Sequence, residues 1–333
     1  MEENRPVLSI CIPTYNRAAV LEKTLDTIVQ QLDDEIEIVI SDNCSTDNTE
    51  EVGRKYANKY KNIKYFRNEV NVRDANFSLS LDRGTGLYLK LMKDSLEIIN
   101  GGLQYLKQII LQYKEARIPL FFTNGKFMSG KTRDVYRCDS FDDFIIHASY
   151  LVTGITFFGC WREQWLLIKN RDKYSKLQLS QDDWIYQLLA IKGKAVLCTK
   201  KYFFLYEVGK RSGYNWFGVH VTNYYNIMKP YVDSEIISKY AVKKEKCAYI
   251  TALKPQLTYA YIYKYMPSWD FDLTGKNKIL WSHFKNVPKY YFVMTMLPFT
   301  GVWIILKNKG RDFLIKHNIW DRIKQNKFIR MFS

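Results

Sequence analysis

The sequence predicts an α/β fold, with a mostly parallel sheet flanked by helices and a helical, basic and aromatic C-terminal region. Strand and helix patterns alternate over the first hundred residues. Strands separated by helices form right-handed βαβ units and hence a parallel sheet. Beyond about residue 215 the pattern becomes helical, lysine-rich and aromatic. The 333 residues are 47% hydrophobic, which excludes a disordered polar chain and is enough for a sizeable core.

Four short apolar runs predict the strands of the sheet. They are residues 7–12, 35–40, 63–67 and 87–92. Each is rich in β-branched or large apolar residues and is followed by polar or turn-forming residues, which is typical of buried strands. Helical spacing and capping residues between the runs predict helices over about 18–30, 45–60 and 76–83.

The next hundred residues continue the alternation less regularly. Helices are predicted over 103–113, 141–148 and from 180 onward, and strands over 119–123, 154–158 and 195–198. No internal repeat or low-complexity linker interrupts the chain. We therefore expect one α/β domain over residues 1–210, with halves at 1–99 and 100–210, and a separate helical region over residues 211–333.

Polar residues follow all four predicted strands of the N-terminal third. The clusters are Thr14-Tyr15-Asn16-Arg17, Ser41-Asp42-Asn43, Asn68 to Asn71, and Lys93-Asp94-Ser95. Ligands of parallel sheets bind outside the carboxyl ends of the strands, so four polar ends predict one binding site. A single Asp or Asn at such a position is more often a turn former or a helix cap.

The charge of the chain is concentrated at its C-terminal end. The net charge is +16, and residues 200–333 hold 23 Lys and Arg against 8 Asp and Glu. Such asymmetry favours an acidic partner surface, either nucleic acid or an anionic membrane. The 6 Cys form no C-x-x-C pair, which argues against a structural zinc site. The N-terminus lacks the pattern of a signal peptide, so we expect a reducing, cytoplasmic compartment.

Four segments resemble the bacterial glycosyltransferase family 2, and they occur in the family's order. They read VLSICIPTYNRAAVLEKTLDTI, EIEIVISDNCSTDNT, NIKYFRNEVN and GLYLKLMKDS. The resemblance covers residues 6–95 and continues more weakly to about 206 through LSQDDWIYQLLAIKGKAVLCTKKYFFLY. It implies a GT-A fold, in which residues 1–99 bind a nucleotide-sugar and residues 100–210 receive the acceptor.

The resemblance also implies an activity. The chain would be an inverting glycosyltransferase that moves a sugar from a nucleotide-diphosphate donor, most commonly a UDP-sugar, to a hydroxyl of a glycan acceptor. The acceptor would be lipid-linked or a polysaccharide, in the biosynthesis of a bacterial surface polysaccharide such as capsule or O-antigen.

Matching positions carry over the family's site residues. The residues expected around the donor are Pro13, Thr14, Tyr15, Arg17, Asp42, Asn43, Asn71, Asn76, Lys93 and Asp94. Among them, Asp42 would hold the base or ribose. Asp183, or its neighbour Asp182, would be the catalytic base that takes the acceptor proton. The structural alternative for this acidic pair is an ordinary N-cap of the following helix.

The metal-binding segment departs from the family pattern. The family reads G-x-Y-x-x-x-L-D-x-D-D, whereas this chain reads GLYLKLMKDSL and keeps one acid, Asp94. One possibility is a divalent metal, Mn or Mg, held by Asp94, donor phosphates, water and a distant ligand such as His220. The other is that Lys93 replaces part of the cation's charge.

The uncharged run at residues 290–306 is the main feature of the C-terminal region. It falls short of the roughly 20 residues that span a bilayer, and Pro298 and Gly301 interrupt it. It is either a buried core helix pair or an interfacial segment. Its basic and aromatic neighbours favour the interfacial interpretation, with the protein peripheral on the inner face of the cell membrane and an anionic membrane surface as partner.

Two other functions compete with the transferase. A sugar-binding or scaffold protein would keep the fold and lose catalysis, which the reduced metal segment allows. A nucleic-acid-binding protein would account for the charge and aromatics. No nucleic-acid-binding motif is present, so no nucleic acid is expected as a partner.

Overall fold

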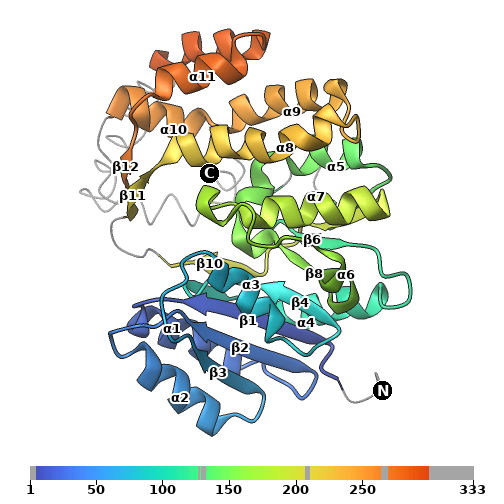
Figure 1. Cartoon of the computed structure of the whole chain (residues 1–333), viewed down its shortest axis with the longest axis vertical. Coiled ribbons are helices and arrows are strands. Elements are labelled where there is room, and N and C mark those ends of the chain that lie inside the picture. The colour runs from blue at the N-terminus through green and yellow to red at the C-terminus, as the bar shows by residue number, and fades with distance from the viewer. Residues whose placement is uncertain (1–4, 127, 129–132, 207–210, 264–268, 300–333) are drawn as a thin grey trace, which may run out of the picture.

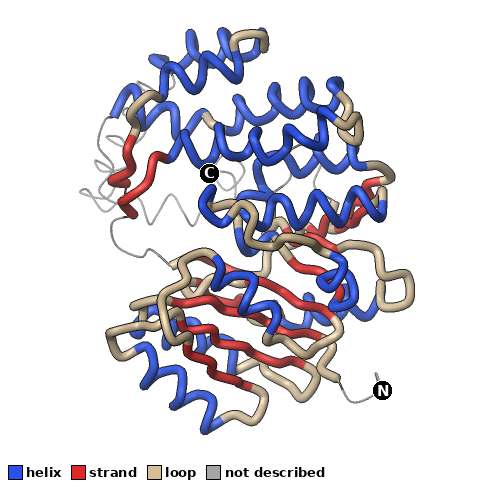
Figure 2. Tube along the Cα trace, in the orientation of Figure 1, coloured by secondary structure: helices blue, strands red, loops and turns tan. Residues whose placement is uncertain are grey.

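The computed structural model describes residues 5–126, 128, 133–206, 211–263 and 269–299. These residues form an α/β layer around a parallel sheet from the N-terminal third and a mostly helical layer from the later part of the chain. In Figure 1 the sheet lies in the lower half and helices α8, α9 and α11 lie in the upper half. Figure 2 shows the same division by secondary structure.

The main sheet has five strands in the order β3-β2-β1-β4-β8. They are β1 (Leu8–Thr14), β2 (Ile36–Asp42), β3 (Ile63–Arg67), β4 (Tyr88–Leu91) and β8 (Gly159–Trp161). The first four are mutually parallel and β8 is antiparallel to β4. Helices α1 (Ala18–Val29), α2 (Thr49–Lys59) and α3 (Ala75–Asp82) connect them. The predicted parallel α/β sheet is confirmed.

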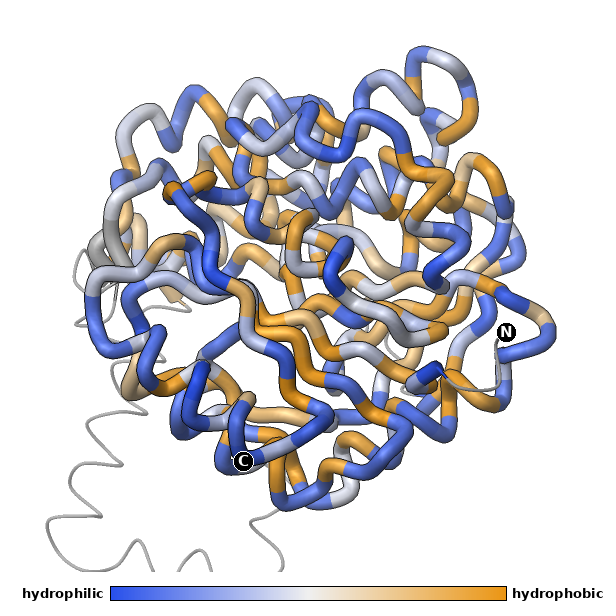
Figure 3. The backbone as a smooth tube through the Cα atoms, turned by 60° about the horizontal axis from the view of Figure 1, so that its bottom comes forward, coloured by the Kyte–Doolittle hydropathy of each residue, from blue (hydrophilic) through white to orange (hydrophobic). Residues whose placement is uncertain are grey.

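Side chains of the central strand β1 alternate between two cores. Leu8, Ile10 and Ile12 belong to one buried cluster, which includes residues of α1 and α2. Cys11 belongs to the other cluster, together with Leu81 of α3. Successive side chains of a strand point to opposite faces, so the continuous apolar run reflects helices on both faces of the sheet. Figure 3 shows the hydrophobic stretches along the central strands.

The second half of the α/β layer adds shorter elements. They are β5 (Leu96–Ile98), α4 (Gly102–Gln112), β6 (Leu120–Phe122), β7 (Val135–Cys138), α5 (Phe141–Ala148), α6 (Arg162–Leu167), β9 (Ala195–Cys198) and β10 (Phe203–Leu205). Strands β6, β9 and β7 form a three-stranded sheet, and β5 pairs with β10.

The strand predicted over residues 154–158 is wrong. Residues 155–157 form a short 3₁₀ turn, and the strand begins at Gly159. The ammonium of Lys90, fully buried in β4, donates to the carbonyls of Thr156 and Phe158. Because these carbonyls accept hydrogen bonds from a side chain and not from a neighbouring strand, the apolar segment forms a turn although its sequence resembles a strand.

The helical layer confirms the predicted helical character of the C-terminal region. It contains α7 (Ser180–Lys192), α8 (Tyr224–Asp233), α9 (Lys239–Ala252), α10 (Lys254–Thr258) and α11 (Lys276–Phe284), with β11 (Arg211–Asn215) paired to β12 (Trp269–Asp272). One buried cluster links Phe144 of α5, Trp184 of α7, Tyr249 of α9 and Phe284 of α11. The region after residue 211 therefore shares its core with residues 138–189.

Residues 288–299 are helical and amphipathic. Tyr290, Val293 and Leu297 are buried in the shared core, whereas Phe292 and Phe299 are 52% and 70% exposed. Of the uncharged run at 290–306, residues 300–306 lie outside the described residues. Within the part of the chain that the structure describes, no helix is both long and apolar enough to cross a bilayer.

Candidate active site

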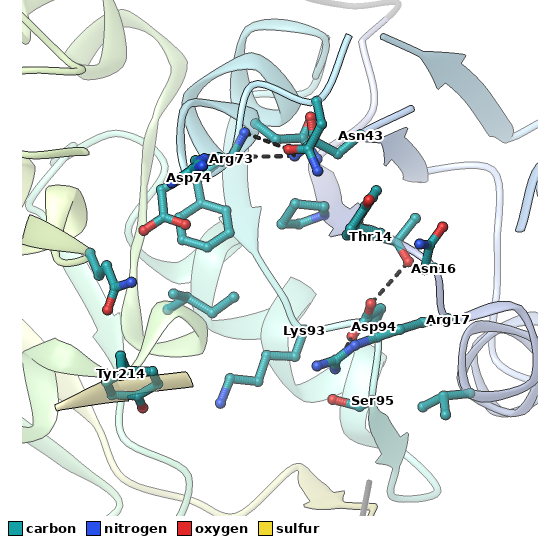
Figure 4. A pocket seen from close by; sticks show the side chains of 18 of the residues that line it. Thr14, Asn16, Arg17, Asn43, Arg73, Asp74, Lys93, Asp94, Ser95 and Tyr214 are labelled. Atoms are coloured by element: carbon teal, nitrogen blue, oxygen red, sulfur yellow. Dashed lines mark hydrogen bonds and ion pairs between the residues drawn. The ribbon is translucent and has the colours of Figure 1, made fainter. Parts of the chain in front are cut away.

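A cavity of ≈ 1140 Å³ lies at the carboxyl ends of β1 and β4. It is larger than most small-molecule pockets, which hold about 300–1,000 Å³. The predicted donor residues that line it are Pro13, Thr14, Tyr15, Arg17, Asn43, Asn71, Asn76, Lys93 and Asp94. Figure 4 shows several of these side chains, with Lys93 extending into the space between Asp94 and Tyr214 of β11.

Asp94 follows β4 and is held by two side chains from the end of β1. The hydroxyl of Thr14 donates to its Oδ2 at 2.9 Å, and Nη1 of Arg17 lies 3.2 Å from its Oδ1. Burial raises the pKa of Asp94, while Arg17 and the Thr14 hydrogen bond act in the opposite direction. The strand end therefore presents a paired carboxylate beside two cations, Arg17 and Lys93.

Asn43, at the end of β2, organises the loop that follows β3. Its amide nitrogen donates to Oδ1 of Asn71 and to the carbonyl of Arg73, and its Oδ1 accepts from the backbone N–H of Val72. Arg73 adopts a positive φ of 53°, which is uncommon for residues other than glycine, asparagine and aspartate. The loop that carries Asn71 and Arg73 into the cavity wall is thus fixed by side-chain hydrogen bonds to β2.

Asn76 and Asp42 are more deeply placed than their predicted roles suggest. Asn76 is buried, with its amide bonded to the hydroxyl and the carbonyl of Ser41. Asp42 is 0% exposed and accepts hydrogen bonds from Ser45 and from the hydroxyl of Tyr65. Asp42 does not line the cavity, so it shapes the wall from behind in this structure.

The acidic pair Asp182-Asp183 lies in the first turn of α7. Asp183 accepts hydrogen bonds from Tyr231 and Gln187, each at 2.8 Å. Asp182 is fully buried, burial raises its pKa well above the ordinary value, and neither of its oxygens has a hydrogen-bond partner among the described residues. Gln178 and Leu179, just before this turn, line the cavity, but the two acids do not.

Sequence reasoning missed several residues of the cavity wall. Asp74 lines the cavity, and burial raises its pKa; Figure 4 shows its carboxylate directed into the space. Tyr214 and Phe271 come from the paired strands β11 and β12. Asp74 could have been noticed between Asn71 and Asn76, whereas the C-terminal residues belong to no motif.

His220 also reaches the cavity wall. It is largely buried, and burial together with the charge of Lys93 lowers its pKa to about 4. The imidazole is therefore neutral at physiological pH. A neutral imidazole can ligate a metal or share a hydrogen bond, and its Nε2 lies 3.4 Å from the hydroxyl of Tyr214.

Asp94 fits a metal site with one carboxylate, and no larger set of ligands accompanies it. Among the described residues, no three His, Cys, Asp or Glu side chains gather as metal ligands. Both oxygens of Asp94 already have protein partners, so an ion would have to displace Arg17, whose side chain is 44% exposed. Magnesium-type sites with one carboxylate complete their shell with substrate phosphates and water.

The comparison with known families supplies the deciding observation. Residues 9–92 match the model of glycosyl transferase family 2. Residues 9–92 are therefore similar to a glycosyltransferase family 2 domain. The matched segment runs from β1 to β4 and ends at the residue before Lys93, so it includes most of the predicted donor residues.

The chain also resembles curated relatives. It is 33% identical over 105 residues to GalNAc(5)-diNAcBac-PP-undecaprenol beta-1,3-glucosyltransferase of Campylobacter jejuni, covering 31% of this chain and 34% of that protein. It is 44% identical over 104 residues to abequosyltransferase RfbV of Salmonella typhimurium, covering 28% and 31%. The matches span about a third of the length of these relatives.

The fold extends beyond the family 2 domain. The structure superposes on the crystal structure of S. aureus TarS with a TM-score of 0.51 and 15% sequence identity, covering 87% of this chain and 55% of that chain. This likeness shows a shared GT-A fold.

Proposed function

We propose that the protein is an inverting glycosyltransferase that uses a nucleotide-diphosphate sugar. The observation that carries this proposal is the convergence of the polar ends of β1, β2 and β4 on one large cavity lined by Arg17, Arg73 and Lys93. These three cations can contact a diphosphate, which is the part of the donor that carries its negative charge, and the carboxylates of Asp47, Asp74 and Asp94 lie in the same lining. The match of residues 9–92 to glycosyl transferase family 2 supports the same chemistry.

In this proposal the end of β4 handles the leaving group. Arg17 and Lys93 face the diphosphate and stabilise the charge that develops on it, while Thr14 and Arg17 hold the carboxylate of Asp94 in place. A divalent cation bound between Asp94 and the donor phosphates would add charge neutralisation there. UDP is proposed as the nucleotide because it is the commonest carrier in the family.

The acceptor hydroxyl attacks the anomeric carbon as its bond to the diphosphate oxygen breaks, which inverts the configuration. A carboxylate must take the hydroxyl proton. We assign this role to Asp183 or Asp182, by their match to the family's acidic segment. Asp74 competes with them, because its carboxylate lines the cavity and theirs do not in this structure.

The proposed acceptor is a lipid-linked or polysaccharide glycan of a bacterial surface polysaccharide. The name of the Campylobacter jejuni relative describes a glycan attached to undecaprenol diphosphate, and that of the Salmonella typhimurium relative describes abequose transfer. An acceptor on a lipid favours a location at the inner face of the cell membrane. The basic C-terminal region supports this location by its charge.

A donor screen tests the proposal. Thermal shift of the full chain would be measured with UDP-, GDP-, dTDP- and CDP-sugars, with and without manganese. Stabilisation by one class, followed by release of the nucleotide when an acceptor glycan is added, is the expected result. Stabilisation without any turnover would favour a sugar-binding scaffold protein, and no stabilisation by any nucleotide would refute the proposed donor site.

A further inference from the structure

A second, smaller cavity of ≈ 570 Å³ lies between α9 and α11, at the end of the molecule away from the main sheet (Figure 1). We name it the basic groove. Its charged and titratable lining residues are Lys239, Lys243, Lys246, His283 and Lys285, and no acidic residue lines it among the described residues. A cavity of this size accommodates a small anionic headgroup.

The lysines at the mouth of the basic groove have no neutralising partner within the structure's described residues. Elsewhere, exposed lysines pair with acids, as Lys55 does with Glu22 and Lys61 with Asp34. No carboxylate of the described residues lies within ion-pair distance of Lys239, Lys243 or Lys285. Like charges gathered without counter-charges repel one another, so the groove favours an external anion.

Two lining residues of the basic groove, Lys246 and His283, pack against the buried ring of Tyr225. The ammonium of Lys246 lies 4.8 Å above its ring, and the imidazole of His283 stacks on the ring at 5.1 Å. Burial lowers the pKa of Lys246 and of His283. The partly desolvated ammonium of Lys246 interacts more strongly with an anion than a free surface lysine does, whereas burial lowers the pKa of His283 to about 4, so its neutral ring offers a hydrogen bond and no charge.

Exposed aromatic side chains adjoin the basic groove. Trp281 is 53% exposed and lies one turn before Lys285 on α11. Its ring meets the ring of Tyr291 at 6.4 Å, and the hydroxyl of Tyr291 donates to the carbonyl of Lys285. Phe292 is 52% exposed beneath the ammonium of Lys289.

Lysines beside exposed Trp, Tyr and Phe are typical of surfaces that lie in a membrane interface, where aromatic rings enter the headgroup level and cations meet lipid phosphates. Residues 236–299 contain ten lysines and three acidic residues. One of these acids, Glu245, is buried. The net positive charge of this segment therefore complements an anionic bilayer.

We propose that the basic groove binds the phosphate groups of anionic phospholipids at a bilayer surface, with Trp281 and Phe292 entering the interface. The inference deepens the proposed membrane location and is independent of transfer chemistry. It assigns attachment to folded helices α9 and α11.

Vesicle co-sedimentation of the full chain tests the proposal. The vesicles contain phosphatidylglycerol and phosphatidylcholine in equal parts, or phosphatidylcholine alone. Each lysine near an anionic surface is worth about fivefold in partitioning. A triple variant should therefore bind the phosphatidylglycerol vesicles on the order of 100-fold more weakly. It combines Lys239→Gln, Lys243→Gln and Lys285→Gln. The matched control removes the same charge near α2 and should bind the vesicles as the unaltered chain does. It combines Lys55→Gln, Lys59→Gln and Lys61→Gln.

Several outcomes would overturn the proposal. These are an equal loss in both triple variants, no loss in the groove variant, or competition by millimolar inorganic phosphate that matches competition by phosphatidylglycerol. Loss of oligonucleotide binding in the groove variant with vesicle binding intact would assign the groove to nucleic acid. Thermal melting of both variants shows whether they fold. If the unaltered chain does not bind vesicles but does bind the donor, the proposed membrane location is wrong and the transferase proposal stands.

Discussion

Asp94 holds Arg17 in the cavity wall and is the proposed carboxylate ligand of a metal. Its carboxylate is shared by Thr14 and Arg17, so Asp94→Asn should release Arg17 and remove the single carboxylate ligand for a metal. We expect activity to fall by at least tenfold, while Ser95→Ala stays close to the unaltered protein. Activity and calorimetric donor affinity would be measured with manganese and with excess chelator. Full activity of the unaltered protein in excess chelator would show that no metal is required. Lys93 would then be the residue that neutralises the charge of the diphosphate.

The proton acceptor can be identified by three substitutions. Asp183→Asn should lower turnover by about 10²–10⁴-fold, the usual contribution of a general base, and should leave donor affinity unchanged. Asp182→Asn and Asp74→Asn are the comparisons, because each keeps the shape of the side chain and removes the base. If Asp74→Asn is the inactive variant and Asp183→Asn turns over normally, the base belongs to the donor loop and the assignment to α7 is wrong.

At the scale of elements, Glu245 of α9 joins three parts of the helical layer. It is fully buried and accepts hydrogen bonds from Ser149, Tyr224 and Tyr225. Burial raises its pKa from 4.5 to about 7, although these hydrogen bonds oppose the rise. Because the pKa in the folded state lies above that in the unfolded state, the stabilising contribution is complete at low pH and is lost as the pH rises through about 7.

We therefore expect the free energy of unfolding to fall by about 3 kcal/mol between about pH 5 and pH 8. Glu245→Gln should reduce this dependence, and buried Asp182, whose pKa is also raised by burial, contributes to the remaining slope in the same direction. Urea midpoints across this pH range provide the measurement, with the exposed Glu163→Gln as control. An unchanged slope in Glu245→Gln would show that other groups cause the pH dependence.

Elements of the sheet could be predicted closely from sequence, because a buried parallel strand is an uninterrupted apolar run. The predicted strand at residues 63–67 and helix at 141–148 coincide with β3 and α5. The failure at residues 154–158 has a tertiary cause, the bond between the buried Lys90 and the backbone carbonyls of that segment. The sequence LYLKLM predicts that Lys90 lies on the exposed face of a strand. Nothing in the neighbouring residues indicates that it is buried.

The same limit applies to the candidate site. Strand-end residues such as Thr14, Asn43 and Asp94 could be placed in one cavity from topology alone, since the carboxyl ends of parallel strands share an edge. Tyr214 and Phe271 could not, because they arrive from the helical layer through contacts that span more than a hundred residues, and His220 could be named only as a possible distant metal ligand. The burial of Asp42 behind Tyr65 likewise depends on the packing of β3.

At the scale of the whole molecule, α11 and the following helix complete a shared core. Leu280, Phe284, Val293 and Leu297 are buried, so removing residues 276–333 should expose the apolar surface of α8 and α9. We expect this truncation to aggregate or to melt at least 10 °C lower than the full protein. Equal melting of the two proteins would show that the helices after residue 276 add nothing to the core.

The central claim is that the cavity at the ends of β1 and β4 binds the diphosphate of a nucleotide-sugar. Isothermal titration of UDP and of the stabilising nucleotide-sugar into the full chain tests it most directly, when repeated with Arg17→Gln plus Lys93→Gln and with the distant pair Lys59→Gln plus Lys61→Gln. We predict saturable binding by the unaltered protein, a loss of at least tenfold in affinity for the cavity variant, and no change for the distant one. Equal affinity in all three proteins, or no binding of any nucleotide to the unaltered protein, would contradict the assignment of this cavity as the donor site.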